Sequence, residues 1–306
     1  MRYPTALSKP AAIVLGCGDI GSAVALALHV AGLAVVLIDE ADPPWHRRGM
    51  AFTNAWYVGN AELDGEGACF CASLKSIPSV HSRRLIAATT WSWPGVASAL
   101  APRVLVDTRR RKRRGSEILL GRVPVTIGIG MDYVEGENVD VAIEPAGDLG
   151  ERLRAELRSR PAAAAAEVGA CREADCIGVE AGRHGRFMTE RRIGDAVRVG
   201  QVVGGLGNEV VVAPAAGVLL GLAARGARIE PGDTLVEVDR AGVAHRCHGI
   251  SEATRRVAAN ALAALSRRGI LSAVPPIGTG SEYGREAGPP TESIVPRIAA
   301  TSVAPS

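Results

Sequence analysis

Short apolar runs and a helical pattern alternate near the start of the chain. Residues 11–15 are five apolar residues that end at a glycine, a pattern typical of a buried parallel strand. Residues 20–31 are rich in Ala and Leu and predict a helix that ends at Gly32, and residues 33–38 form a second apolar run. Strand, glycine turn, helix and strand within about 30 residues predict a βαβ unit with a right-handed crossover.

The pattern continues with further strands and helices. Three later apolar runs predict strands, two short segments predict helices, and a long amphipathic segment predicts a C-terminal helix with Ser251 as its N-cap. The strands are expected at 103–107, 123–129 and 139–143, and the helices at 95–101, 150–158 and 250–268.

Between these regions lies an internal repeat with an offset of 32 residues. Residues 181–203 and 213–235 share the spacing of their glycines, and each copy consists of short apolar runs between those glycines. Two copies are too few for a solenoid, so they predict a small β-sandwich with internal two-fold symmetry. Lipoyl and biotinyl carrier domains are built in this way and have a similar size.

Taken together, the patterns predict an α/β protein with an inserted all-β unit. We expect a Rossmann-like parallel-sheet domain over 1–160 and a barrel-sandwich (lipoyl/biotinyl-like) insert over 177–240. A C-terminal segment with its helix, 241–272, is expected to pack on the first domain. The tail, 273–306, is rich in Pro, Gly, Ser and Thr and is expected to be disordered.

Composition narrows the classes of partner. The chain has 306 residues, with 35 Lys and Arg against 32 Asp and Glu, so its net charge of +3 gives no reason to expect nucleic acid or an anionic membrane as partner. The apolar stretch 23–38 is interrupted and shorter than the roughly 20 residues of a membrane span. Six cysteines in a chain of this length do not indicate a disulfide scaffold. We therefore expect a cytoplasmic protein.

The turn after the first strand carries a G-x-G-x-x-G pattern. Gly16 allows a tight turn, Gly18 lets the backbone approach a pyrophosphate, and Gly21 lets helix and strand pack closely. Asp39 ends the second strand, where a carboxylate can bind a ribose hydroxyl and would disfavour a 2′-phosphate. Asp19 would repel phosphate unless it caps the helix. The pattern favours a nucleotide-like ligand, such as a dinucleotide; the alternative is a loop of this fold that no longer binds one.

Lysine is nearly absent and none follows Lys112. In the carrier domains the modified lysine lies on the hairpin between the two halves. Here that hairpin is 204–209 and contains no lysine, so we expect no covalent lipoyl or biotin group.

Three further residues are candidates for chemistry, each with a structural alternative. Asp107 ends a strand, where it could bind a metal ion or a ligand hydroxyl, or cap a turn. Lys112 belongs to the basic run 109–114, which could hold phosphate or form a solvated loop. Cys17 precedes a helix, where thiol pKa falls, although a small loop filler is the alternative. The cysteines lack zinc-ligand spacing, so they are expected to be ordinary buried residues and no metal site is predicted.

Several of these stretches match one protein family. Gly16 to Asp19 fits its G-A-G-D loop, Asp39 fits the acid after its second strand, and the 32-residue repeat fits its β insert. Over about residues 11–265 the chain resembles the selenium-dependent molybdenum hydroxylase system proteins, accessory proteins distantly similar to xanthine dehydrogenase accessory proteins. The other matches are Arg47 with Arg48, Phe52 to Gly59, Val104 to Asp107 with Lys112, Gly128 to Gly130, Val139 to Glu144, Cys247, and Ile250 with Ser251.

Two segments depart from the family pattern. Met131, Asp132 and Tyr133 stand where the family tends to read Pro-Gly-Phe. Pro145 to Asp148 stands where it tends to read Thr and then Arg-Gly-His, so the histidine is missing. If that histidine takes part in ligand binding, this chain is altered in its function.

The resemblance implies an accessory protein for maturation or cofactor insertion of a molybdenum hydroxylase, which would be its partner. Its ligand would then be an NAD-like or molybdopterin dinucleotide, held by Gly16, Gly18, Asp19, Gly21 and Asp39. One alternative is an NAD-dependent oxidoreductase that uses the same loop, although no paired Tyr and Lys for hydride chemistry is found. The other is a non-catalytic scaffold that docks through its β insert. Asp107, Lys112 and Cys17 are the candidates for catalysis, and whether any reaction occurs is left open.

Overall fold

We describe a computed structural model of the chain over residues 10–43, 45–109, 117–145, 168–170 and 176–271. Its contacts divide the chain into two units, 1–275 and 276–306, and every described residue lies in the first. The helix predicted at 150–158 and the predicted tail lie outside the described residues.

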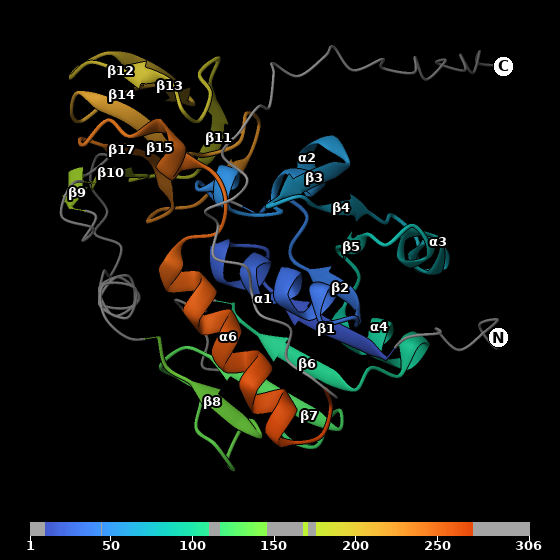
Figure 1. Ribbon diagram of the computed structural model, residues 1–306. Coiled ribbons are helices and arrows are strands. Elements are labelled where there is room, and N and C mark those ends of the chain that lie inside the picture. The colour runs from blue at the N-terminus through green and yellow to red at the C-terminus, as the bar shows by residue number, and fades with distance from the viewer. Residues whose placement is uncertain (1–9, 44, 110–116, 146–167, 171–175, 272–306) are drawn as a thin grey trace, which may run out of the picture. The chain divides into compact units, whose positions relative to one another are not determined.

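The first layer is a sheet of eight strands in the order β3-β4-β5-β2-β1-β6-β7-β8 (Figure 1). All neighbours are parallel except β3 and β4, which form an antiparallel hairpin at one edge. The strands are β1 (Ala11–Leu15), β2 (Ala34–Ile38), β3 (Asn60–Leu63), β4 (Glu66–Phe70), β5 (Ile86–Thr89), β6 (Val104–Asp107), β7 (Val125–Ile129) and β8 (Val141–Ile143).

Helices cover both faces of this sheet. On one face α1 (Asp19–Val30) packs against β1 and β2, and α6 (Glu252–Arg267) lies beside α1 and reaches β8 (Figure 1). On the other face Ile13 and Leu15 of β1 share a core with α3 (Ile77–Ser82) and α4 (Trp93–Leu100). Alternate strand residues therefore point to opposite helix layers, which is why the central strands are apolar throughout.

The helix predicted at 250–268 is present as α6, and its start is fixed as predicted. Ser251 is the N-cap, and its hydroxyl accepts a hydrogen bond from the Thr254 backbone N–H. The sequence analysis placed no elements between residues 39 and 94. There the structure has α2 (Asn54–Val58), the β3–β4 hairpin, α3, the central strand β5, and two short 3₁₀ turns, η1 (Arg48–Met50) and η2 (Leu74–Ser76).

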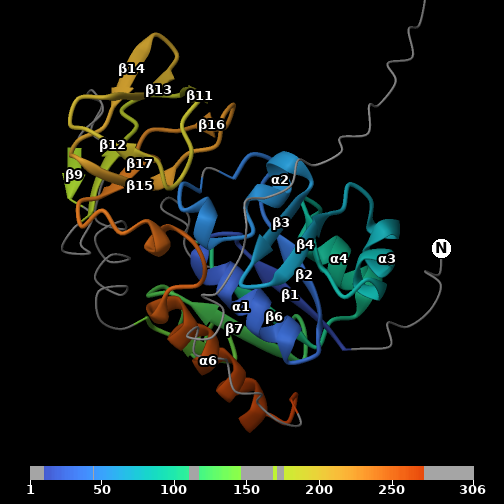
Figure 2. The ribbon, with the colours of Figure 1, turned by 45° about the horizontal axis from the view of Figure 1, so that its top comes forward.

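Residues 168–170 and 176–240 form two antiparallel sheets around one core (Figure 2). Phe187, Leu219 and Leu235 are buried in that core. One sheet has the order β12-β15-β17-β10-β9 and the other β14-β13-β11-β16. Their bounds are β9 (Val168–Ala170), β10 (Cys176–Glu180), β11 (Gly185–Met188), β12 (Ala196–Val197), β13 (Val202–Leu206), β14 (Glu209–Val212), β15 (Gly217–Leu222), β16 (Arg228–Ile229) and β17 (Thr234–Asp239). We call residues 176–240 the insert.

The 32-residue offset of the sequence repeat recurs in the strand pairing. Arg186 of β11 pairs with Arg228 of β16, and Ala196 of β12 pairs with Val218 of β15; adding 32 to 186 and 196 gives 218 and 228. The Gly194 N–H bonds the Leu219 carbonyl, and the Gly226 N–H bonds the Phe187 carbonyl, again at the same offset. Each copy of the repeat thus pairs a strand with the other copy.

Candidate functional site

The glycine loop follows β1 and opens α1, as the sequence predicts. Gly16 has a φ of +100°, a conformation that L side chains rarely adopt. A Cβ on Gly21 would lie 1.8 Å from the Gly16 carbonyl oxygen, so only glycine lets the first turn of α1 approach the loop this closely. These two glycines have the roles that the sequence assigned to them.

The loop lies at the topological switch point of the sheet, where the chain stops adding strands on one side of β1 and starts adding them on the other. From β1 the chain continues to β2 on one side of the sheet, and it later returns to β6 on the other side of β1. In open parallel sheets, ligands bind outside the carboxyl ends of the strands at such a point. The Gly16 loop, Asp39 and Asp107 follow or end three adjacent strands, so the topology brings these predicted residues to one edge.

Asp39 holds the loop itself. Its Oδ2 accepts a hydrogen bond of 2.6 Å from the Cys17 backbone N–H, and its Oδ1 accepts one of 2.8 Å from the Glu40 N–H. The carboxylate is partly exposed, so a ligand hydroxyl can still reach it. Asp39 therefore fixes the glycine loop and remains accessible at the site.

Asp19 is buried and turns toward the helix. Its Oδ1 accepts a hydrogen bond of 2.8 Å from the Ile20 backbone N–H. The carboxylate thus accepts one of the free N–H groups in the first turn of α1, although the N-cap residue itself is Gly18 and Asp19 is the first residue of the helix.

The expectation of a lowered thiol pKa at Cys17 is wrong. Burial raises the pKa of the Cys17 thiol well above its usual value, and the nearby Asp39 carboxylate adds to this effect. The thiol contacts the Thr53 hydroxyl at 3.5 Å and has no exposed surface. Since the thiolate is the reactive form, the structure supports the small-filler alternative.

Trp45 covers Gly18, and the sequence analysis did not foresee it. The three atoms nearest to a Cβ on Gly18 would be indole atoms of Trp45, at 3.3, 3.4 and 3.5 Å. The open side of Gly18, through which a pyrophosphate would approach, is therefore faced by an aromatic ring. Trp45 also contacts the ring of His46, with 5.1 Å between the ring centroids.

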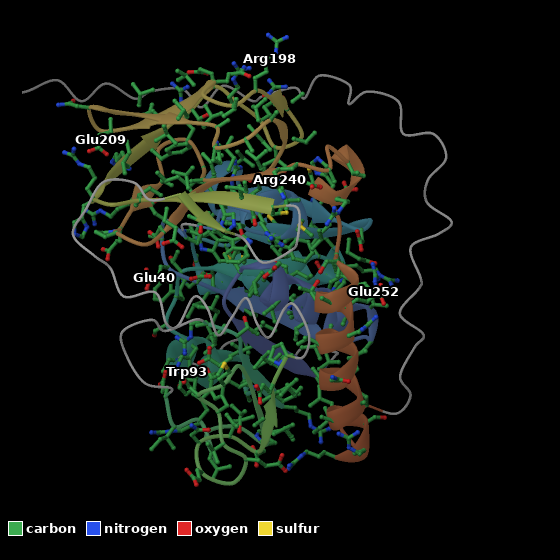
Figure 3. The ribbon with its side chains drawn as sticks, turned by 90° about the vertical axis from the view of Figure 1, so that its left-hand side faces the viewer. Glu40, Trp93, Arg198, Glu209, Arg240 and Glu252 are labelled. Atoms are coloured by element: carbon green, nitrogen blue, oxygen red, sulfur yellow. The ribbon has the colours of Figure 1, made fainter. Side chains whose placement is uncertain are left out.

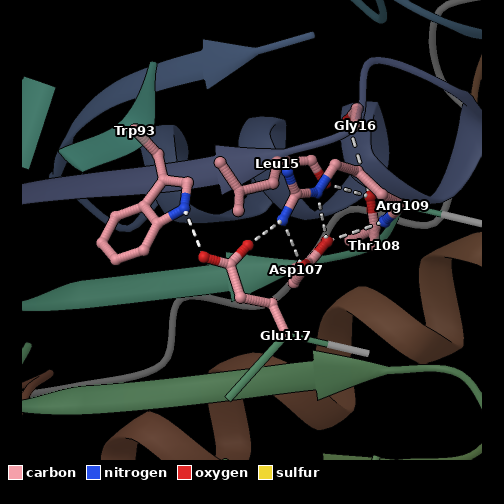
Figure 4. A network of polar contacts seen from close by, with 7 residues as sticks. All are labelled: Leu15, Gly16, Trp93, Asp107, Thr108, Arg109 and Glu117. Carbon is pink, nitrogen blue, oxygen red and sulfur yellow. Dashed lines mark hydrogen bonds and ion pairs between the residues drawn. The ribbon is translucent and has the colours of Figure 1, made fainter. Parts of the chain in front are cut away.

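Asp107 is fully buried and bound by Arg109 (Figure 4). Its Oδ1 accepts hydrogen bonds from the Arg109 backbone N–H at 3.0 Å and from Nε at 2.9 Å, and its Oδ2 accepts one from Nη2 at 2.6 Å. Arg109 also bonds Glu117, which accepts from the indole N–H of Trp93. This geometry is that of a turn-capping carboxylate, one of the two alternatives for Asp107. Arg109 lies beside the glycine loop, because a Cβ on Gly16 would be 3.4 Å from its Cγ.

Two other predicted features bear on the same edge. Tyr133, in the segment that departs from the family pattern, is buried, and its ring fills the space beside Gly128, where a Cβ would lie 2.1 Å from the ring. Lys112, the remainder of the basic run and residues 146–148 lie outside the described residues.

The segment 46–48 connects this edge to the insert. Arg47 donates from Nε to Glu237 Oε2 and from Nη2 to Oε1, each at 2.7 Å, and His46 Nε2 lies 3.1 Å from Oε2. Burial by itself raises the pKa of the Glu237 carboxyl, but Arg47 and His46 outweigh it and hold the pKa well below its usual range. The arginine pair named for the family resemblance is the only sequence signal that pointed to Arg47, and none pointed to Glu237.

The described cysteines have the burial expected of ordinary core residues, with one exception. Those in the described residues are free, and all but the half-buried Cys69 are buried. Among the residues that the structure describes, no three His, Cys, Asp or Glu side chains are placed to hold a metal ion. No described helix has the length and apolar character needed to cross a membrane.

Comparison with known proteins gives one distant similarity. The chain is 25% identical over 260 residues to the uncharacterized protein YqeB of Escherichia coli (strain K12). The match covers 83% of this chain and 47% of YqeB, so the chain spans about half the length of this curated relative. No family model matches the chain.

Proposed function

We propose that the chain binds a nucleotide-like ligand, of the dinucleotide class, at the glycine loop. The observation that carries this proposal is the geometry of Gly16, Gly21 and Asp39 at the switch point of the sheet. We further propose that the parallel sheet is a Rossmann-like domain. Its six strands β5-β2-β1-β6-β7-β8 follow the order of that fold, in which this loop binds a pyrophosphate.

The residues present fit such a ligand. The loop offers backbone N–H groups at the start of a twelve-residue helix, and Asp39 is accessible to a ribose hydroxyl. Asp19 is turned toward the Ile20 N–H, which supports the fit because part of its charge is offset there. The indole of Trp45 supplies the three atoms nearest to the open side of Gly18, so a phosphate reaches Gly18 when the indole moves aside.

The proposed cellular role is that of an accessory protein in the maturation of a molybdenum hydroxylase, in the cytoplasm. Its support is the sequence resemblance over residues 11–265, with the matched residues Asp39, Arg47 and Arg48. In this proposal the ligand is an NAD-like or molybdopterin dinucleotide, the insert is a barrel-sandwich unit, and a molybdenum hydroxylase is the partner. Mass spectrometry of small molecules released from the purified protein tests the ligand, and recovery of an unrelated class of molecule would contradict it.

Site-directed binding measurements test the loop. Gly18→Val places a side chain between the loop and the phosphate and should weaken binding of NAD⁺ at least tenfold, about 1.4 kcal/mol. Gly95→Val, at a half-buried position of α4, is the matched control and should leave calorimetric affinity unchanged. Equal affinities of wild type and Gly18→Val for NAD⁺ would contradict the assignment of the binding site to this loop. Tighter binding of NAD⁺ than of NADP⁺, lost in Asp39→Asn, would place the ribose at Asp39.

The exposed face of the insert favours a second candidate, a scaffold that docks a partner. Met188, Val202, Val210 and Val212 are exposed on the sheet β14-β13-β11-β16. Val202 and Val212 are a cross-strand pair, and Val210 and Met188 both lie opposite Gly205, so the four share one face. Val210→Glu should abolish binding of a purified molybdenum hydroxylase if this face docks it, whereas Val199→Glu, at an exposed valine on none of these strands, should not.

A further inference from the structure

The segment 46–48 packs against the sheet β12-β15-β17-β10-β9 of the insert at Glu237, where the neighbouring strands carry glycines. Glu237 lies on β17, and its partners across the two neighbouring strands are Gly178 and Gly221. A Cβ on Gly221 would lie 2.4 Å from His46 Cδ2. The missing side chain at Gly221 therefore leaves room for the ring of His46, and Gly178 flanks the buried carboxylate on the other neighbouring strand. We call Gly178, Gly221 and Glu237 the socket.

Backbone contacts fix the same segment against β15. The Leu222 N–H donates to the His46 carbonyl at 2.8 Å, and Arg48 Nε donates to the Leu222 carbonyl at 3.0 Å. Arg47 and Glu237 are each 2% exposed, so the ion pair is closed to water. Trp45 immediately precedes these anchors, so its position depends on how the segment is seated in the socket.

The chain returns to the glycine loop a few residues later. The Thr53 hydroxyl donates to the Cys17 carbonyl at 2.9 Å, and the Phe52 N–H donates to the Ser22 hydroxyl at 2.9 Å. The Ser22 hydroxyl in turn donates to the Cys17 carbonyl at 3.0 Å. The segment 45–53 is thus attached to the loop at both of its ends and to the insert in its middle.

We propose that the insert regulates access to the glycine loop by holding Trp45 over Gly18. This inference rests on the proposed binding of a phosphate-containing ligand at the loop. A phosphate that approaches Gly18 meets the indole first, so ligand binding and seating of His46 and Arg47 in the socket oppose each other. Any event that pulls the insert away from this segment would release Trp45 and open the loop, and a bound ligand would weaken the docking of the insert by the same factor.

Fluorescence of Trp45 tests the first half of this coupling without a ligand. In a full-length chain with Trp56, Trp91 and Trp93 replaced by Phe, Trp45 is the only indole. Glu237→Gln should increase quenching of its emission by acrylamide, because the buried Arg47 loses its charge partner. Gly221→Ala, which removes the space for His46 and leaves the charges in place, should act in the same direction. Glu209→Gln, on the outside of the insert in an exposed ion pair, is the matched control and should have no effect (Figure 3).

Calorimetric titration with NAD⁺ and with ADP tests the second half of the coupling, the opposition between the covering indole and ligand binding at the loop. Trp45→Ala and Gly221→Ala should bind the probes about tenfold more tightly than wild type, as expected if the loop is uncovered about a tenth of the time. Variants that are merely less stable would bind more weakly, so the sign separates regulation from damage.

The outcomes separate this inference from the proposed function. Unchanged quenching in both Glu237→Gln and Gly221→Ala, with the fold intact by circular dichroism, would overturn the inference. Increased quenching in these variants would overturn it as well if the affinity of Gly221→Ala and Trp45→Ala for the probes stays at the wild-type value. If neither probe binds wild type or Trp45→Ala, the proposed ligand class falls, and the claim of regulated access falls with it.

Discussion

Two Arg–carboxylate pairs anchor segments that contact the glycine loop, and they differ in sequence separation and in burial although their chemistry is the same. Arg109 and Asp107 are two residues apart, and the guanidinium remains partly exposed. Arg47 and Glu237 are 190 residues apart, and both are buried. The first pair closes a turn that local sequence already specifies, whereas the second joins the parallel sheet to the insert. The same two chemical groups therefore stabilise a local turn in one place and a contact between distant parts of the chain in the other.

Removing the arginine of the buried pair should have the largest effect. Arg47→Met leaves the Glu237 carboxylate in an apolar environment without its charge partner, which costs about 3–5 kcal/mol of unfolding free energy. Urea denaturation at neutral pH measures it. Arg183→Met, which breaks an exposed pair with Glu209, is the control and should cost at most about 1 kcal/mol. Similar losses in the two variants would refute the distinction between buried and exposed pairs.

Acid should remove part of the stability that the buried pair provides. Because the pKa of Glu237 is held well below its usual range in the fold, its contribution is complete above the unfolded pKa of about 4.3 and is lost as pH falls through the folded pKa. The difference in unfolding free energy between wild type and Glu237→Gln should therefore be constant from neutral pH down to about 5 and shrink below it. A difference that stays constant to pH 3 or grows on acidification would show that Glu237 does not titrate as described.

Breaking the Asp107–Arg109 pair should cost less unfolding free energy than breaking the Arg47–Glu237 pair. Asp107→Asn keeps an oxygen that can cap the Arg109 backbone N–H but loses the charge, and the partly exposed guanidinium can turn to Glu117 or to water. We expect a loss of about 1 kcal/mol in thermal unfolding and little change in affinity for a dinucleotide. Abolished binding with unchanged stability would instead make Asp107 a ligand-binding residue.

The same contrast explains what could be predicted from the sequence. The Gly16–Gly21 turn, α1 and the capped start of α6 are set by neighbouring residues, so their patterns were readable. The socket was not readable, because nothing in a strand sequence shows that Gly221 faces His46 across the chain. Cys17 was misjudged for a related reason. Its helix N-terminus is visible in the sequence, but its burial and the approach of Asp39 depend on tertiary packing.

Trp45 illustrates the limit most clearly. It follows the second strand by only a few residues, yet its contact with Gly18 depends on a segment anchored by a residue from the far end of the insert. The stretch between residues 39 and 94 was left without elements because its helices and strands are short and lack a sustained apolar period. Long-range docking, rather than local propensity, decides the arrangement there.

The exchange of strands between the two repeat copies constrains how the chain is made. β11, in the first copy, pairs with β16 in the second, and β12 pairs with β15. The ribosome must therefore have synthesised and released the chain through residue 229 before β11 can pair with β16. It must have released the chain through residue 237 before Arg47 can pair with Glu237. Neither copy is an independent folding unit, and pairings of high sequence separation are slow to form. During synthesis Arg47 thus remains in water until Glu237, just beyond the second copy, is available to pair with it.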